Sequence, residues 1–346
     1  MAGVRVTSAP AQTVLAQPGS HTPRSYYVDA TGALRRDLSV AELARVVQDG
    51  VGQLWVDVDV GNRYQVALLE KVWAFHPLSI EDTLNPSSRV KVEEYPGYLF
   101  TVIRGVRLYE ETQDPYDLET YNLCCYLGRN YVVTVHGGQS PAIAAVADRL
   151  TRNPEILRRG AARLMHAILD GAVDAFFPIL DQIDDFLDNV EQRVFERFEQ
   201  VVLRDIFAVR RLVVSLRRHL APQREAFNML TNRPTPFVDP EVQLYFRDIY
   251  DHVLRISESL DAYRDLLSGA MESYLTQVSN RLGGITKGLA VIGTVSIPFV
   301  VVSGMWGMNF EQIPLAQAPH GFWWMMVAQL VIGLALLVAL RWRGLL

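Results

Sequence analysis

The stretch Gly304–Pro314, GMWGMNFEQIP, decides the fold because of the apolar segments on either side of it. Leu289–Trp306 reads LAVIGTVSIPFVVVSGMW and contains no charged residue. Gly321–Leu340 reads GFWWMMVAQLVIGLALLVAL, again without a charge. A helix of about 20 residues spans roughly 30 Å, the thickness of the hydrocarbon core of a bilayer. We therefore expect two transmembrane helices; the alternative is a buried helix of a soluble core.

Charged residues around these segments predict the orientation. The connection Asn309–His320 has no Lys or Arg. Arg281 and Lys287 precede the first span, and Arg341 and Arg343 follow the second. Because Lys and Arg accumulate on the cytosolic side, both flanks and both termini are expected in the cytosol and the connection outside. The predicted location is a bacterial-type plasma (inner) membrane.

The N-terminal part predicts an α/β domain with a small sheet. Leu54–Val60, LWVDVDV, alternates like a strand, and LGRN reads as the turn of a hairpin between YNLCCY and YVVTVH. In SVAELARVVQDG, Ser39 is a helix N-cap with Glu42 three residues later, and Gly50 ends the helix. Residues 1–24 lack the continuous apolar core of a secretory signal and read as a disordered tail.

The part after residue 140 predicts helices. APQR at Ala221–Arg224 predicts a break, whereas Asp239 and Pro240 predict the start of a long helix. If that helix runs to Met308, it is roughly 100 Å long and must pack against neighbours. The expected domains are a tail 1–24, a cytosolic α/β domain 25–155, a helical stalk 156–285, a first span 286–308, an external loop 309–320, a second span 321–341 and a cytosolic tail 342–346.

Composition and motifs argue against several functions. The net charge of −5 does not suggest a nucleic-acid binder. The adjacent Cys124 and Cys125 suit neither a metal cluster nor a disulfide framework, and they read as reduced residues in a strand. The sequence has no GxSxG, HExxH or Walker loop, so we expect no enzyme.

Three acidic groups are candidate cation sites. The first is the run Asp181, Asp184, Asp185, Asp188 and Glu191, read either as a solvated surface or as a weak site for hard divalent cations. The second is HPLSIED, with His76, Glu81 and Asp82, where the His reads as structural at a helix start. The third is Asp248, Asp251 and His252, within about one helical turn. Solvation or an inter-helix salt bridge is the alternative for that group.

A stripe of residues recurs every three or four positions along the first span. Its members are Thr286, Leu289, Gly293, Ile297, Val300 and Gly304. Small residues let membrane helices approach closely, so the stripe is either a packing face or the lining of a narrow pore with a hydrophobic constriction. Two spans do not enclose a pore, so the second alternative requires an oligomer.

The motif at the end of the first span resembles that of a known family. Gly307, Met308 and Asn309 form the GMN tripeptide of the CorA family of magnesium and cobalt channels. Further segments resemble the family in the same order, from about Val56 to the C-terminus: HPLSIEDTLN, RVKVEEYPGYLF, YFRDIYDH, YRDLLSG and YLTQVSN. The resemblance implies an α+β membrane protein: a funnel-shaped homopentamer of cytosolic α/β domains, with a very long helix continuing into the first of two C-terminal spans.

The resemblance also implies a function and its residues. The substrate is hydrated Mg²⁺, also Co²⁺ and by extension Ni²⁺, selected at Gly307, Met308 and Asn309 after attraction by Glu311. Asp82 and Asp248 match a regulatory Mg²⁺ pair between subunits, and Glu81 and Asp170 match a second site. Asp251 and His252 are weaker candidates. Bound Mg²⁺ would bridge carboxylates that otherwise repel and so close the channel.

Some positions depart from the family pattern, and other functions remain open. Trp306 stands where relatives carry Tyr, and Leu315 and Ala316 stand where many carry a second acid. One alternative is a zinc transporter of the same superfamily, of the ZntB kind, although no His/Cys cluster lies near the pore. Another is a membrane-anchored sensor or scaffold that conducts nothing.

Overall fold

A seven-stranded sheet organises the N-terminal part of the chain. The computed structural model describes residues 22–108, 118–196, 200–308, 313 and 318–343. In these residues the sheet order is β2-β1-β3-β7-β6-β5-β4, and only the β3–β7 pair is parallel. The strands are β1 (Arg24–Val28), β2 (Leu34–Arg36), β3 (Gln53–Asp59), β4 (Lys91–Tyr95), β5 (Tyr98–Leu108), β6 (Leu118–Leu127) and β7 (Tyr131–His136).

Local sequence signals explain several of these strands. The predicted hairpin across LGRN is confirmed, since β6 and β7 pair antiparallel with Leu127 opposite Val132. The predicted strand at Leu54–Val60 is confirmed as β3, but its alternation does not mark a solvated face. Leu54 to Val58 are all buried, because β3 lies between β1 and β7 and carries helices on both sides. Cys124 and Cys125 are free thiols buried in β6, as expected of reduced strand residues.

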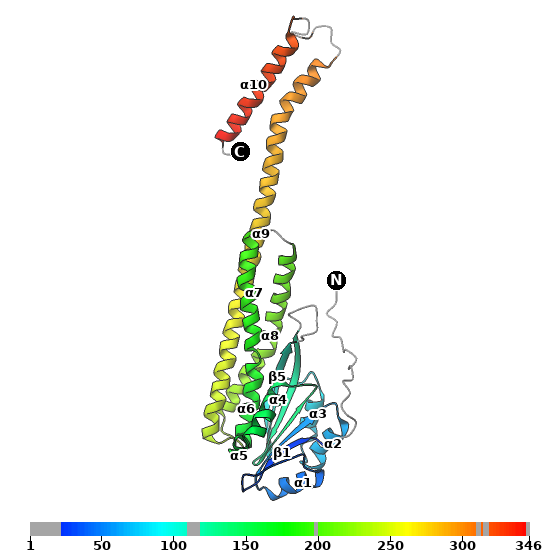
Figure 1. Ribbon diagram of the computed structural model, residues 1–346, viewed down its shortest axis with the longest axis vertical. Coiled ribbons are helices and arrows are strands. Elements are labelled where there is room, and N and C mark those ends of the chain that lie inside the picture. The colour runs from blue at the N-terminus through cyan, green and yellow to red at the C-terminus, as the bar shows by residue number, and fades with distance from the viewer. Residues whose placement is uncertain (1–21, 109–117, 197–199, 309–312, 314–317, 344–346) are drawn as a thin grey trace. The chain divides into compact units, whose positions relative to one another are not determined.

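Helices cover both faces of the sheet (Figure 1). One face packs against α1 (Val40–Asp49), α2 (Arg63–Lys71) and α3 (Pro77–Leu84), and the other against α4 (Pro141–Arg152), α5 (Glu155–Arg158) and α6 (Ala161–Asp174). The predicted signals of α1 are confirmed. Ser39 and Glu42 form a capping box, and Gly50 is a left-handed C-cap. α6 contacts four strands of the sheet, which fixes the position of its acidic residues.

Long helices follow: α7 (Phe177–Glu196), α8 (Gln200–Asn232), α9 (Pro240–Trp306) and α10 (Gly321–Trp342). The break predicted at Ala221–Arg224 is wrong, because α8 continues through Pro222. A proline inside a helix costs about 3 kcal/mol. The buried stripe continues past it through Gln223, Phe227 and Leu230, and this packing offsets the cost. The predicted start of α9 at Pro240 is confirmed.

Side-chain contacts tie the first part of α9 to its neighbours. Phe246, Ile249, Val253, Ile256, Leu260 and Leu267 are all buried at helical spacing. The Tyr263 hydroxyl donates to Asp184 of α7 at 2.6 Å, and Asp261 pairs with Arg217 of α8 at 2.8 Å. One member of the Asp181–Glu191 run, Asp184, is therefore a hydrogen-bond acceptor, although it is exposed like Asp181, Asp185 and Asp188.

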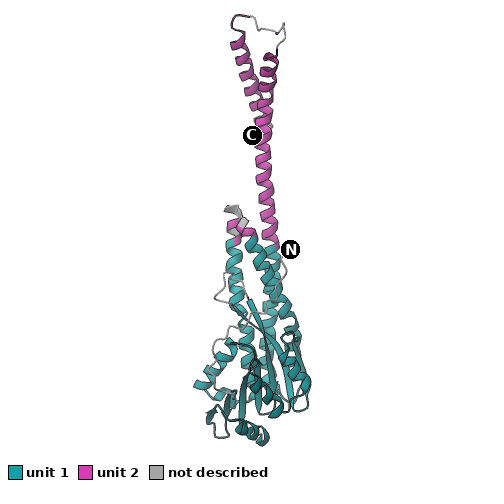
Figure 2. Cartoon of the chain, turned by 90° about the vertical axis from the view of Figure 1, so that its right-hand side faces the viewer, with its two compact units in different colours: residues 1–189, 204–267 teal, residues 190–203, 268–346 magenta. Residues whose placement is uncertain are grey.

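Contacts divide the chain into two units, residues 1–189 with 204–267 and residues 190–203 with 268–346 (Figure 2). In the second unit α10 runs back beside α9, and the Phe299 ring packs over Gly333. The spans in α9 and α10 have mean hydropathies of 2.0 and 2.2, and 0% and 6% of them are buried. They are the two candidate transmembrane helices, while the predicted domain boundaries stay predictions. Residues 1–21 of the predicted tail lie outside the described residues.

Replacing Gly52 by Ala is expected to destabilise the domain more than replacing Gly50. Both glycines have positive φ, +75° and +65°, which costs an L-residue about 1–2 kcal/mol. At Gly52 the new Cβ would also lie 2.5 Å from the Val28 carbonyl oxygen, whereas at Gly50 nothing lies within 4 Å. The midpoint of denaturant unfolding of the full-length protein in detergent measures both. Equal midpoints would contradict the steric account.

Candidate metal centre

Two carboxylates and one imidazole meet where α6 packs against α9. Asp170 and Asp174 are four residues apart and share one face of α6, and His252 lies on α9. One ligand atom from each lies within 4.8 Å of the other two. Oxygen and imidazole nitrogen are the donors that divalent cations take in proteins. These three residues, named here the α6–α9 trio, therefore have the composition and spacing of a cation site.

The electrostatics of the trio also favour a cation. Oδ1 of Asp170 is buried and has no hydrogen-bond partner among the residues that the structure describes. Burial and the nearby Asp174 carboxylate raise the pKa of Asp170, and His252 partly opposes the shift. Nδ1 of His252 lies 3.2 Å from Oδ1 of Asp174, at ion-pair distance but without hydrogen-bond geometry. A cation would relieve the repulsion and supply the partner that Asp170 lacks, so the residues fit a divalent ion.

The site residues predicted on α6 and α9 do not all lie together. Asp170 and His252 lie close to each other in the trio, whereas Asp251 is exposed and lies outside it. Asp248 is also exposed, one turn before His252, and its charge acts on Asp170 and on His166. Sequence reasoning missed Asp174. The available signal was its place one turn after Asp170.

The residues predicted on α3 lie in a different environment. Asp82 accepts a hydrogen bond from the Lys91 ammonium at 2.6 Å and one from Ser88 Oγ at 3.2 Å. In the described part of the chain, no hydrogen bond or ion pair joins Asp82 to Asp248. Glu81 is exposed. His76 accepts the Leu78 amide through Nδ1 as the N-cap of α3, so its predicted structural role is confirmed.

The stripe on α9 faces away from α10. The partly buried residues of this span are Val291, Gly293, Val295, Pro298, Phe299, Val302 and Trp306. At about 100° per residue, all of them except Gly293 lie on the face opposite the stripe. Leu289, Ile297 and Val300 are 65%, 61% and 69% exposed, and no described residue has an atom within 4 Å of a Cβ built on Gly293 or Gly304. Thr286 is the one member of the stripe that also faces α10, because it lines a groove shared with Leu340.

The GMN tripeptide begins where α9 ends. α9 stops at Trp306, and the Gly307 amide donates to the Ser303 carbonyl at 3.0 Å. The Met308 amide donates to the Met305 carbonyl at 3.3 Å, and Met308 is 50% exposed. Asn309 and Glu311 lie outside the described residues. The exposed stripe thus leads along α9 to the start of the motif.

Comparison with known proteins decides the family. The sequence model described as "CorA-like Mg2+ transporter protein" matches residues 52–341. The chain belongs to this family. The resemblance predicted from GMN and the flanking segments is therefore confirmed, and the family is one of divalent-cation transporters rather than enzymes.

Individual relatives cover most of the chain. YfjQ of Bacillus subtilis, named as a metal ion transporter, is 33% identical over 294 residues, 84% of this chain and 90% of YfjQ. The cobalt/magnesium transport protein CorA of Thermotoga maritima is 30% identical over 277 residues, 80% of this chain and 78% of that protein. The CorA magnesium transporter structure from Methanocaldococcus jannaschii matches with a TM-score of 0.79 at 21% identity, over 92% of this chain and 97% of that one. This last likeness supports the α/β domain, the long helix and the two apolar helices.

If Asp82 binds Mg²⁺, as the family resemblance implies, replacing Lys91 by Gln is expected to increase the affinity of Asp82 for the ion. The Lys91 ammonium occupies the same carboxylate that the ion would use. A partly exposed ion pair is worth about 0.2–1 kcal/mol, so the affinity should rise by a factor of about 1.4 to 5. The change in affinity is measured as the Mg²⁺ concentration at which half of the protein is protected from trypsin. Lys71→Gln, at an exposed position on α2, is the control, and equal midpoints for the two variants would contradict the expectation.

Protonation of His166 is expected to destabilise the fold as the pH falls. Burial and then the Arg163 charge lower the pKa of His166 from 6.5 to about 4. Between these values the unfolded chain binds more protons, so stability is complete above pH about 6.5 and is lost towards pH about 4. His166→Gln keeps a donor for the Tyr245 carbonyl, which the ring nitrogen meets at 3.1 Å. Its unfolding midpoint should fall less over this range than that of the wild type, and parallel curves would contradict the assignment.

Proposed function

We propose that the protein is a homopentameric channel that admits hydrated Mg²⁺, also Co²⁺ and by extension Ni²⁺, across the plasma membrane. One observation carries the proposal. The apolar stripe of α9 is exposed, faces away from α10 and leads to the GMN tripeptide. A face that is neither packed against the second span nor charged suits the lining of a pore between copies. The N-terminal domains and both termini would lie in the cytosol.

Pore formation would require several copies, because two helices enclose no channel. Each copy would contribute α9 to the lining, and α10 would lie on its outer side. Leu289 and Ile297 would form hydrophobic rings where the pore is narrow. Gly293 and Gly304 would widen it or allow neighbouring helices to approach. Five copies in a funnel is the arrangement that the family resemblance implies.

Selection would act on the hydrated ion. Mg²⁺ loses its water reluctantly, so a ring of Asn309 side-chain carbonyls would accept hydrogen bonds from its water shell. A neutral amide binds weakly enough to release the ion. Glu311, the only formal charge between residues 309 and 320 apart from any charge on His320, would attract cations to the mouth.

Regulation would use repulsion between carboxylates in the cytosolic part. The α6–α9 trio and Asp248 form one acidic surface, and Glu81 and Asp82 of a neighbouring copy would form the other. Without a cation the two surfaces repel, and a bound Mg²⁺ would bridge them through its waters. High internal Mg²⁺ would therefore stabilise the closed pentamer, and low Mg²⁺ would release it.

The donor set favours Mg²⁺ and Co²⁺ over Zn²⁺ as the main substrate. Zinc prefers nitrogen and sulfur ligands, and the described part of the stripe offers neither. Cys124 and Cys125 are buried in the sheet, where burial raises the pKa of both thiols and keeps them protonated. His252 gives the trio one nitrogen ligand, which suits Co²⁺ better than Mg²⁺.

Replacing Asn309 by Ala is expected to abolish transport. Loss of the side-chain carbonyl removes the acceptor for the ion's water shell. Uptake of Mg²⁺ into proteoliposomes should fall to that of protein-free liposomes. Gln317→Ala removes an amide from the same connection and should retain uptake. Proton-driven Zn²⁺ uptake with little Mg²⁺ flux in the wild type would favour the zinc alternative instead.

Replacing Asp248 by Ala is expected to weaken the response of the cytosolic part to Mg²⁺. The variant removes one carboxylate from the regulatory surface, so bridging by the ion is lost. Protection from trypsin should then depend less on Mg²⁺ than in the wild type. The control is Glu258→Ala, which removes another acid from the part of α9 that belongs to the first unit. An unchanged response in the Asp248 variant removes this residue from the site.

A further inference from the structure

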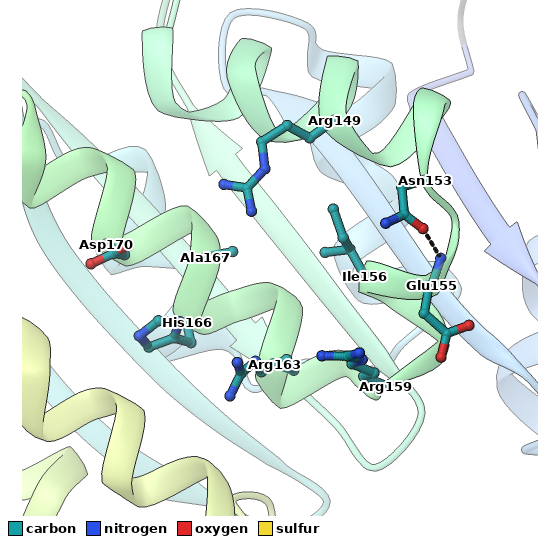
Figure 3. A pocket seen from close by; sticks show the side chains of 9 residues that line it. All are labelled: Arg149, Asn153, Glu155, Ile156, Arg159, Arg163, His166, Ala167 and Asp170. Carbon is teal, nitrogen blue, oxygen red and sulfur yellow. Dashed lines mark hydrogen bonds between the residues drawn. The ribbon is translucent and has the colours of Figure 1, made fainter.

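A cavity of about 240 Å³ lies beside the α6–α9 trio and is lined by arginines (Figure 3). Arg149 reaches into it from α4, Arg159 follows α5, and Arg163 lies on the first turn of α6. Asn153 lies on the rim, and Asp170 of the trio closes one end. The cavity is therefore formed by three helices of one compact unit, with guanidinium groups converging on it from different elements.

The positive charge of this cavity is only partly balanced, because Glu155 and Asp170 line it together with the three arginines. In the described part of the chain, Arg149, Arg159 and Arg163 form no ion pair with a carboxylate. Of the two acids in the lining, Glu155 pairs with Arg158 at 3.2 Å, and Asp170 interacts with the Arg149 charge without forming an ion pair with it among the described residues. Like charges brought together without a counter-charge repel one another. The remaining excess of positive charge carries a cost that a bound anion would reduce.

One of the guanidinium groups is held in place before any ligand binds. The guanidinium carbon of Arg163 lies 3.1 Å from the centre of the Tyr245 ring, stacked on its face. Stacking uses the face of the group and leaves its N–H edges free. The nearby His166 has a lowered pKa and is neutral at pH 7, and its Nε2 meets the Tyr245 carbonyl, so the arginines carry the charge.

We propose that this cavity binds a phosphate-bearing anion with at least two negative charges. Guanidinium groups pair with phosphate oxygens through two parallel N–H bonds, which a chloride ion does not match. Arg149 and Arg159 would bind from opposite sides, and the stacked Arg163 would fix the phosphate between them. The volume admits a pyrophosphate or the phosphates of a nucleotide, with the rest of a nucleotide outside.

The position of the cavity links this site to the trio. Asp170 belongs to both, so an anion held by the arginines would lie next to the proposed cation. Opposite charges at adjacent sites raise each other's affinity by the same factor. The protein would then respond to Mg²⁺ together with phosphate compounds. The binding of phosphate itself does not depend on the proposed transport function.

Calorimetric titration of the full-length protein in detergent with sodium pyrophosphate tests the site. The titration is made in EDTA and repeated in excess Mg²⁺. Arg149→Gln and Arg159→Gln should each weaken binding about tenfold or more, because a charged hydrogen bond to phosphate is lost. Arg152→Gln, also on α4 but paired with Asp148 outside the cavity, should bind like the wild type. If the site recognises only the phosphates, ATP in EDTA should also bind, and the same two substitutions should weaken its binding.

Several outcomes would overturn the proposal. One is a wild-type protein that does not bind pyrophosphate in either buffer. Another is an Arg149→Gln variant that binds it as tightly as Arg152→Gln. A third is an Arg149→Gln protein that changes its oligomeric state while the wild type ignores pyrophosphate, because the arginines would then bind carboxylates of a neighbouring copy. Arg149 and Arg159 are exposed, so both variants should fold, and their unfolding midpoints check this.

Discussion

A backbone that crosses lipid must satisfy its own hydrogen bonds, and α9 does so as a single helix of 67 residues. The same element carries Asp248 and His252 in the first unit and the apolar stripe in the second. No loop separates the acidic face from the span. The proposed regulation rests on this continuity, because a charge change around Asp248 would occur on the same helix that carries the stripe.

Electrostatic repulsion is the second constraint. Asp170 has a raised pKa and lies next to another carboxylate, and its buried oxygen has no hydrogen-bond partner within the described part of the chain. Burial favours the protonated form of such a group, and a nearby cation favours the charged form. Lys91 satisfies Asp82 by an ion pair, so the two proposed ligand groups differ in how they are balanced without metal. This difference predicts that they fill at different Mg²⁺ concentrations.

Local signals in the sequence predicted much of the fold. The charge-free runs predicted both candidate spans, the Ser39–Glu42 pair predicted the start of α1, and LGRN predicted the hairpin. These features were predictable because each of them depends on residues that are close together in the sequence. Contacts between distant segments were not predictable in the same way. Asp174 joins His252 only because α6 packs against α9, and Pro222 is tolerated only because α8 is buried on both sides of it. The GMN tripeptide was enough to indicate the family. The arginine cavity could not be predicted in this way, because its residues come together only when three helices pack.

Electrical recording in a planar bilayer, with Mg²⁺ raised only on the side of the N-terminal domain, measures whether Mg²⁺ bound to that domain closes the channel. We expect a Mg²⁺ current from the opposite side when Mg²⁺ on the domain side is low, and a smaller current as Mg²⁺ on the domain side is raised. Asp170→Asn combined with Asp248→Asn should keep the current at high Mg²⁺. A wild-type current that does not depend on Mg²⁺ on the domain side would contradict the account.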